Sequence, residues 1–371
     1  MTIPGLKLLD KLILGDLMPK LLASIATFSA VFLITGPILA ASRFEAAGIP
    51  WWIIAEFVGW DFTAFIRYTF PMGMLLAALL GFDRLSRDSE AVALFAGGIS
   101  FGRIMVPVIG LGLLVSFIGY LFNDRIASYA LQRSNAISEH RQDLLGETSK
   151  PFDFATRKDG KLTATVHVEQ GYDAQAKAMR RVTVTEYGAD GRPVQIYYAA
   201  RATPHGTGFR SWTGQDVEVA SLMPLGGLAH VNQLELGEKI NKTPENIAFL
   251  QRDPDTLNFH DLQRQITELR LGGGDSADIR NAEVNLWFKV SLPFSCLIFG
   301  LVGAPLGLRS PRSAKISGFV WALPILLGYY VIFTTMQNIA TGGGVSPILA
   351  AWLPNIIGLL VGSGLIWKAS V

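Results

Sequence analysis

Long runs of apolar residues fill the first and the last parts of the chain, and a polar stretch separates them. Residues 21–42 and 104–123 carry no charge, and each run is long enough to cross about 30 Å of hydrocarbon as a helix. Residues 62–82 form a third run if Arg67 lies at its outer end, where a long basic side chain can reach the interface. Residues 1–123 are therefore predicted to form an N-terminal membrane part with three spans.

The last part of the chain repeats this pattern. Residues 290–308 carry no charge, and a basic turn follows them. The uncharged stretch that comes next is too long for one helix, and the glycines and proline of residues 340–347 predict a turn within it. Residues 290–371 are therefore predicted to form a C-terminal membrane part with three further spans, at about residues 290–308, 316–338 and 348–367.

The polar stretch between these parts has the pattern of a β domain. Val166, Val184 and Ile196 each lie in a segment in which apolar and polar residues alternate, as in a strand with one buried face. Asp159-Gly160 and Asp190-Gly191 are typical of hairpin turns. An antiparallel β sandwich or half-open barrel is therefore predicted within residues 124–257.

Residues 258–289 contain two helical segments joined by a glycine hinge, and they are predicted to return the chain to the membrane. Lys and Arg are concentrated at the N-terminus, in residues 83–103, in residues 309–315 and at the C-terminus. Because cytoplasmic loops carry an excess of basic residues, both termini are predicted to be cytoplasmic. The β domain is then predicted to face the periplasm.

Composition supports a polytopic membrane protein and excludes several kinds of chemistry. Half of the residues are hydrophobic and the mean hydropathy is +0.34. The chain has no Walker-type phosphate loop, its five histidines lack ligand spacing, and Cys296 has no partner. No catalytic constellation is evident, and the predicted spans hold no mid-span carboxylate for ion coupling. We therefore expect no enzyme activity, no cofactor, no metal and no nucleic-acid partner, and we expect energy to come from another chain.

Residues 83–103 are the best candidate for contact with that partner. A short amphipathic helix at about residues 86–99 is predicted, ended by Gly97-Gly98. Glu90 would pair with a basic residue of the partner. The helix would present four apolar residues to a groove: Leu85, Val92, Leu94 and Phe95. The same pattern also fits a helix that lies on lipid, with Glu90 stabilised only by the helix dipole.

Three stretches of the chain resemble the LptF/LptG family of lipopolysaccharide export permeases. Asp88-Ser89-Glu90 followed by AGGIS at residues 96–100 resembles the family's coupling segment, D-S-E…A-x-G-[IV]-S. Residues 291–319, SLPFSCLIFGLVGAPLGLRSPRSAKISGF, are similar to the family's PLACLVFALLGVPLGLR…GF. The Asp190-Gly191 turn followed by Tyr198-Ala199-Ala200 is the third stretch. The plan of three spans, an outward β domain and three spans is also that of the family.

The resemblance implies a transport function. Two such permeases would pair, and a dimer of a cytoplasmic ABC ATPase would bind beneath them. The complex would take lipopolysaccharide or a related lipid from the inner membrane and pass it through periplasmic jelly-roll-like domains to bridge proteins that lead to the outer membrane. The coupling segment, carried onto Ser89, Glu90, Gly97 and Gly98, would dock on the ATPase.

The resemblance also implies where lipid is handled. The first and fifth spans would form lateral gates. Arg43 and Arg67 are the candidates for contact with lipid head groups, although the residues alone favour ordinary interfacial anchoring for Arg43. Val166, Val184 and Ile196 would line an apolar groove for acyl chains.

Two other readings of the residues stay open at this point. The chain could be a membrane-anchored periplasmic lipid-binding or scaffold protein with no transport role of its own. It could also be an envelope enzyme, although the residue types for a catalytic site are missing.

Overall fold

The computed structural model describes residues 8–41, 49–144, 151–158, 161–173, 176, 178–188, 190–205, 211–222, 227–240, 243–272, 275–308 and 317–370. The chain divides into two compact units. The first, called here the membrane unit, comprises Met1–Ser138, Asp255–Phe259 and Val284–Val371. The second, called the β unit, comprises Glu139–Pro254 and His260–Glu283.

Six helical stretches among the described residues are long and apolar enough to cross a membrane. An antiparallel sheet is inserted between the third and the fourth of them. The predicted fold class of three spans, a β domain and three spans is therefore confirmed. The stretches are Leu8–Ala41, Trp51–Arg87, Phe101–Ser138, Ser276–Leu308, Ala322–Thr341 and Pro347–Lys368.

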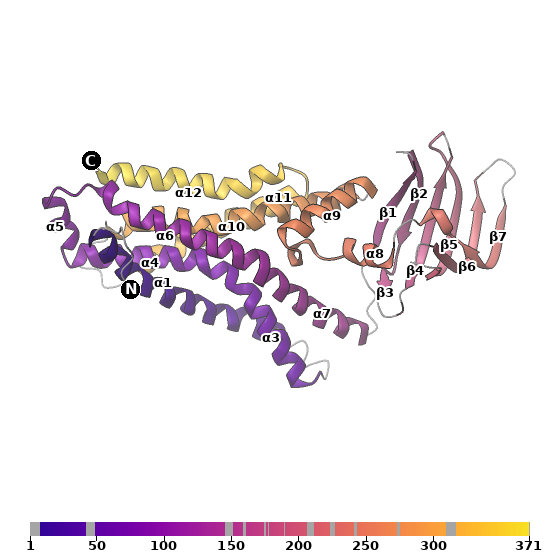
Figure 1. Cartoon of the computed structure of the whole chain (residues 1–371), viewed down its shortest axis with the longest axis horizontal. Coiled ribbons are helices and arrows are strands. Elements are labelled where there is room, and N and C mark those ends of the chain that lie inside the picture. Colours follow the sequence, from indigo (N-terminus) through magenta and orange to yellow (C-terminus); the bar gives the residue numbers. More distant parts are fainter. Residues whose placement is uncertain are drawn as a thin grey trace. The chain divides into compact units, whose positions relative to one another are not determined.

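Figure 1 shows the helices of the six stretches. The first three stretches contain α1 (Leu8–Leu33), η1 (Ile34–Ile38), α3 (Trp51–Phe65), η2 (Ile66–Tyr68), α4 (Thr69–Arg87), α6 (Phe101–Leu121), η3 (Phe122–Ala127) and the first part of α7 (Ser128–Leu144). The short helix α5 (Glu90–Ala96) lies between the second and the third stretch. The last three are α10 (Ser276–Leu308), α11 (Ser317–Thr341) and α12 (Pro347–Ser370).

The second stretch begins at Trp51, well before the predicted span at residues 62–82. Its two α-helices are joined by the 3-10 turn η2, directly before Pro71. Proline lacks the N–H that would bond to the carbonyl of Arg67, so the tighter turn lies where the regular helix cannot continue. The aromatic residues expected to precede the span thus form part of a longer, interrupted helix.

Helix α4 packs at the centre of the membrane unit, and glycines allow its neighbours to come close. Gly73 and Gly81 of α4 face α1, where an added Cβ would lie 2.6 Å from Ile25 Cγ1 and 2.5 Å from Leu17 Cδ2. On α10, a Cβ at Gly307 would lie 2.6 Å from the carbonyl oxygen of Leu79. Small residues at such positions let helix backbones approach within a membrane.

The first described residues of α1 and the last of α12 lie at the same end of the membrane unit as α5 (Figure 1). We call this the α5 end. Leu9 of α1, Ile99 after α5 and Ile366 of α12 pack against one core cluster there. Asp255 and Thr256 of the short turn η5 (Pro254–Thr256) belong to the membrane unit, and Asp255 pairs with Arg67 just before α4 begins, at the opposite end, which we call the η5 end.

The β unit is a single seven-stranded antiparallel sheet in the order β1-β2-β4-β5-β6-β7, with β3 paired to β4. Its strands are β1 (Phe152–Lys158), β2 (Lys161–Val168), β3 (Tyr172–Asp173), β4 (Ala178–Tyr187), β5 (Pro193–His205), β6 (Ser211–Ser221) and β7 (Leu228–Glu235). The turn η4 (Gly237–Lys239), α8 (Pro244–Leu250) and α9 (Phe259–Gly272) follow the last strand.

The predicted Asp190-Gly191 hairpin turn joins β4 to β5. The amide of Gly188 donates to the carbonyl of Arg192, and Gly191 has a φ of +74°, which favours glycine. The Asp159-Gly160 turn lies outside the described residues, as do two of the three residues of the predicted hinge at 272–274.

We predict that replacing Gly307 with alanine destabilises the membrane unit by about 1–3 kcal/mol, because the methyl group would overlap the backbone of α4. Thermal denaturation of the detergent-solubilised chain measures this change. Gly110→Ala is the matched control, since no atom lies within 4 Å of its added Cβ. A lower melting midpoint for both variants, or for neither, would contradict the packing argument.

Candidate functional site

The coupling segment between α4 and α6 is fixed at both ends by its backbone. Ser89 precedes α5 with a φ of 59°, a left-handed conformation that is uncommon for serine. At the other end, Gly98 has a φ of +80°, and the amide of Ile99 donates to the carbonyl of Leu94. The four predicted coupling residues therefore bracket one seven-residue helix, Glu90–Ala96.

Helix α5 has one face packed on the membrane unit and one face open. Ala91 is buried, and Leu94 packs against the core cluster of the α5 end. Val92 and Phe95 are 51% and 42% exposed, and they form the open apolar face. The prediction that Leu85 is presented to a partner is wrong, because Leu85 belongs to α4 and is buried among the bundle helices.

Glu90 has a partner within its own chain. Its carboxylate accepts from Arg84 at 3.2 Å, and Arg84 also lies 2.6 Å from Asp16 of α1 and 3.4 Å from Asp88. Lys20 lies 2.5 Å from the same oxygen of Asp16. These five residues form what we call the inner ion network, and it connects α1, α4 and α5.

A second cluster of charges occupies the η5 end of the membrane unit. Both terminal nitrogens of Arg67 donate to the carboxylate of Asp255, at 2.9 and 2.7 Å, and one also donates to the Tyr68 hydroxyl. Arg67 was expected to extend into the interface, but its side chain is only 9% exposed. Burial would raise the pKa of Asp255, yet the charges of Arg67 and Lys289 outweigh it and lower that pKa.

Lys289 belongs to the same cluster, and sequence reasoning missed it. Its side chain is 5% exposed, and its Nζ donates to Ser128 Oγ at 2.6 Å. The side-chain amide of Asn123 donates to the carbonyl of Lys289, and the carboxylate of Asp124 accepts from the backbone amide of Phe259 at 2.6 Å. These contacts hold the 255–259 segment against the helices. Only the position of Lys289 at the start of an apolar run could have drawn attention to it.

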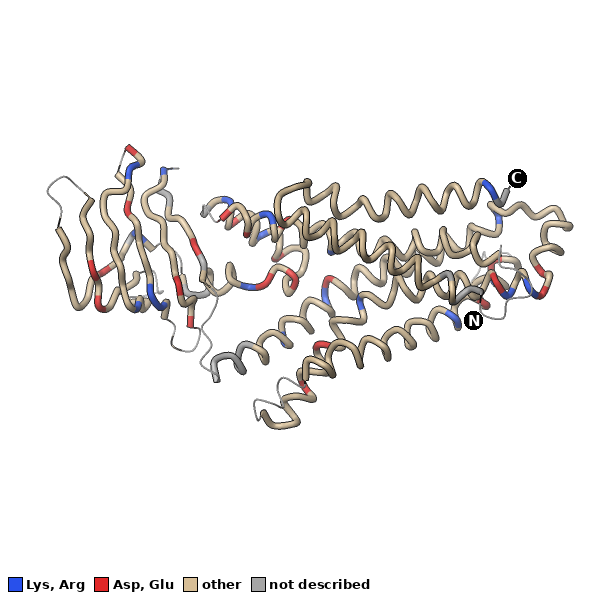
Figure 2. Tube along the Cα trace, turned by 180° about the vertical axis from the view of Figure 1, so that it is seen from behind, with Lys and Arg blue, Asp and Glu red and all other residues tan. Residues whose placement is uncertain are grey.

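Charged residues are thus concentrated at the two ends of the membrane unit, with largely uncharged helix between them (Figure 2). Glu90 and Arg67 belong to opposite clusters, so the predicted coupling residues and Arg67 do not form one site. Arg43 lies outside the described residues.

The predicted acyl-chain residues do not share one face of the sheet. Val166 pairs with Val184, and Val184 pairs with Tyr197, so these side chains point into the β-unit core. Ile196 pairs with Thr185, which places it on the opposite face. The alternation alone could not reveal this, because it does not tell which of the two faces of β5 packs into the core of the β unit.

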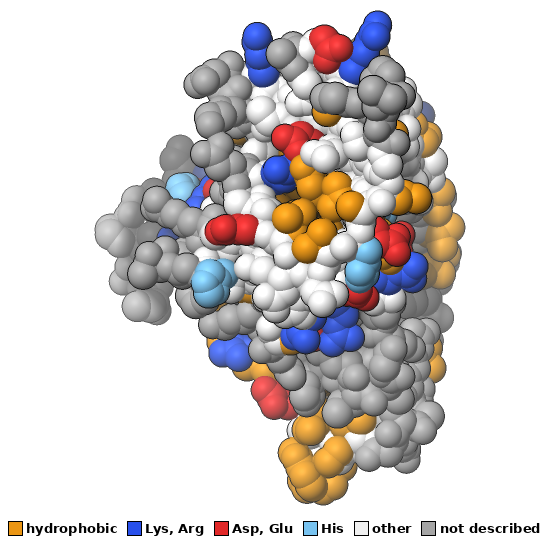
Figure 3. Space-filling view, turned by 90° about the vertical axis from the view of Figure 1, so that its right-hand side faces the viewer, with side chains coloured by type: hydrophobic (Ala, Val, Ile, Leu, Met, Phe, Trp, Pro, Cys, Tyr) orange, Lys and Arg blue, Asp and Glu red, His pale blue; other side chains and the backbone are white. Residues whose placement is uncertain are grey.

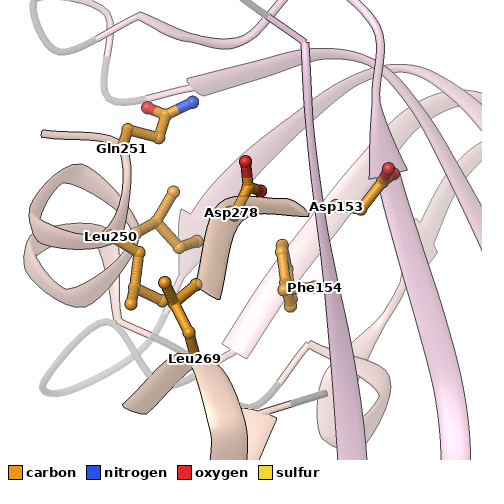
Figure 4. Close-up of a pocket in the computed structure, with 7 residues that line it drawn as sticks. Asp153, Phe154, Leu250, Gln251, Leu269 and Asp278 are labelled. Atoms are coloured by element: carbon orange, nitrogen blue, oxygen red, sulfur yellow. The ribbon is translucent and has the colours of Figure 1, made fainter. Parts of the chain in front are cut away.

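The buried face of the sheet is filled by the unit's own side chains, including Trp212, Met179 and Ile247. A cavity of about 30 Å³ remains between β1, α8, α9 and the start of α10, and Figure 4 shows its lining residues. This volume suits about one water molecule and is too small for an acyl chain. Within the described part of the chain, no three His, Cys, Asp or Glu side chains are grouped to hold a metal ion.

The chain resembles known proteins over most of its length. A sequence model described as "Lipopolysaccharide export system permease LptF/LptG" matches residues 11–368. The lipopolysaccharide export system permease protein LptG of Escherichia coli (strain K12) is 22% identical over 317 residues, which cover 82% of each chain. The permease protein LptF of the same strain is 21% identical over 325 residues, covering 83% of this chain and 81% of that protein. LptF of Shigella flexneri matches to the same extent.

We predict that Asp255→Ala lowers the stability of the membrane unit by roughly 3 kcal/mol, because it leaves the buried guanidinium of Arg67 without its carboxylate. The measurement is the thermal midpoint of the purified chain in detergent. Glu56→Ala serves as control: it removes an exposed carboxylate from the same unit and is expected to change stability by less than about 0.5 kcal/mol. Equal effects of the two substitutions would show that the Arg67 pair is an ordinary surface contact.

Proposed function

The chain belongs to the LptF/LptG family of lipopolysaccharide export system permeases, and we propose that it works in the inner membrane as one of two paired permeases driven by a separate ATPase. It is a multi-pass membrane protein and a subunit of a transporter, and members of this family are not enzymes.

The observation that carries the proposal is the open face of α5. Val92 and Phe95 are exposed beside Glu90, at the end of the membrane unit where α1 begins and α12 ends. An exposed apolar pair beside a carboxylate suits the groove of a partner protein better than water. We infer that the α5 end faces the cytoplasm and that a dimeric ABC ATPase binds α5 there, through the segment from Ser89 to Gly98.

The second permease and the lipid would meet the sides of the bundle. Helix α11, the fifth span, exposes an apolar stripe at Val320, Leu323, Leu327 and Val331. The first span exposes Leu22 and Val31 of α1 and Ile34 of η1. Such surfaces suit lipid tails or another helix, which supports lateral gates at the first and fifth spans. We propose that lipopolysaccharide or a related lipid enters between these surfaces.

The bridge proteins would meet the β unit at an edge of its sheet. Strand β7 is the last strand in the sheet order, and Leu228 and Val231 on it are exposed, the first by 83%. Figure 3 shows hydrophobic side chains gathered near the centre of the face viewed from this side. An exposed edge strand with apolar side chains is a template for strand addition. We propose that a periplasmic bridge protein pairs with this edge.

Lipid contact by Val166 and Val184 stays a prediction, and we add a condition to it. Because these side chains lie in a filled core, acyl chains could reach them only if the cover formed by α8 moved away from the sheet. Ile196, on the other face, would be reached without that movement.

Native mass spectrometry of the tagged chain, purified gently from its own membranes, tests the proposal. We expect a complex with a second six-span protein, two copies of an ATPase and bound glycolipid. A lone chain or a homodimer without ATPase or lipid, across several detergents, would instead support a scaffold role.

We predict that Glu90→Arg uncouples the assembled transporter, because it reverses the charge beside the open face of α5. Lipid release from proteoliposomes should fall roughly tenfold or more, while the chain still folds and purifies as a single species. Glu90→Gln removes the charge without reversing it and should give a smaller loss. Normal transport by Glu90→Arg would remove the assignment of Glu90 to the coupling contact.

A further inference from the structure

Arg84 is the one side chain through which the inner ion network joins three segments. It lies at the end of α4 and contacts Asp16 of α1 at 2.6 Å and Glu90 of α5 at 3.2 Å. We propose that Arg84 is a positioning residue that passes movement of α5 to α1, so that binding of the ATPase alters the first span. This inference rests on the proposed function, and it assigns a route for coupling within this chain.

Asp16 is placed to respond to the loss or gain of Arg84. Its side chain is only 9% exposed, and one of its oxygens accepts from both Arg84 and Lys20. Its other oxygen is buried and has no hydrogen-bond partner among the described residues. A largely buried carboxylate gains more from each cation than an exposed one, because water screens it less. The position of Arg84 therefore matters to α1.

Arg84 can adopt two sets of ionic contacts, one with Glu90 as a partner and one without it. With α5 unbound, Glu90 and Asp16 share the guanidinium. A basic residue of a docked partner would compete for Glu90, and Arg84 would then be left to Asp16 and Asp88. Arginine suits this exchange because its planar fork of donors serves several carboxylates at once. At 43% exposure, its side chain has room to change partners.

The same turn of α1 holds the closest contact with α4. Leu17, the residue after Asp16, meets Gly81 so closely that an added Cβ would lie 2.5 Å from its Cδ2. The ionic contact and the tight helix contact therefore act at one level of α1. Leu94 of α5 packs against the same core cluster as Leu17, so α5 and α1 are connected by apolar contacts as well as by the ion network. A shift of Arg84 would thus act on a turn of α1 that is tightly packed, so α1 would move with it and not adjust locally.

The test compares two carboxylates of α1 in the reconstituted complex. Asp16→Asn weakens the contact with Arg84, whereas Asp10→Asn weakens an equally short contact, 2.6 Å, with Arg103 of α6 that does not involve α5. We measure lipid released per ATP hydrolysed. Asp16→Asn and Arg84→Gln should each lower this ratio roughly five- to tenfold, and the double variant should lower it no further, as expected for residues of one network. Asp10→Asn should leave the ratio within about twofold.

Retention of the wild-type ratio by both Asp16→Asn and Arg84→Gln would overturn the inference, and so would an equal loss in Asp10→Asn. Arg84→Lys provides a second test in case the other variants fail to assemble, since it keeps the charge but replaces the planar fork, whose nitrogens reach separate carboxylates, with a compact point charge. An intermediate ratio supports the bridging role, and a wild-type ratio contradicts it. Failure of the wild-type chain to bind an ATPase or release lipid would instead refute the proposed function.

Discussion

A charge cannot be left unpaired in the hydrocarbon of a bilayer, and this constraint organises the membrane unit. The main ion pairs of the described spans lie toward its two ends: those of Arg84 and the Arg103–Asp10 pair at the α5 end, and the Arg67–Asp255 pair at the η5 end. Between them the interior holds small polar contacts only, such as the Tyr329 hydroxyl with Asn355 and the Asn355 amide with the carbonyl of Ser291. The ends of the bundle are therefore where ionic contacts with a partner or a ligand can form.

The two clusters have different characters because their surroundings differ. Arg67 is fixed by a bidentate pair with Asp255 and by Tyr68, an arrangement that suits a permanent joint. Arg84 is more exposed; it donates to Asp16 and Glu90 and forms a longer ion pair with Asp88. A shared guanidinium can exchange partners at low cost, since the loss of one contact is compensated by the others. The Arg67 cluster thus has the geometry of a permanent structural contact, and the Arg84 cluster that of a contact whose partners can change.

The sequence predicted the spans and the inserted sheet because hydropathy and strand alternation are local properties of the chain. It could not predict the partners of the charges, since Arg67 and Asp255 are 188 positions apart and Lys289 and Ser128 are 161 apart. Leu85 was misplaced for a related reason: hydropathy marks it as apolar, but only the extent of α4 decides that it faces the bundle. Ile196 depended on strand register, which a β-bulge between Glu186 and Tyr187 shifts near the hairpin.

The second span links the two clusters mechanically. Arg67 lies in the 3-10 turn η2 that precedes α4, and Arg84 lies in the last turn of α4. Between them α4 packs closely on α1 through Gly73 and Gly81, and on α10 through the glycines of that helix. A helix so tightly held moves as a rigid body with its neighbours and does not bend freely. The interrupted turn at η2 is the weaker point, because Pro71 removes a backbone hydrogen bond there. A displacement of α4 at the α5 end is therefore expected to move the Arg67–Asp255 pair by nearly the same amount. Any bending of the second span is expected at η2.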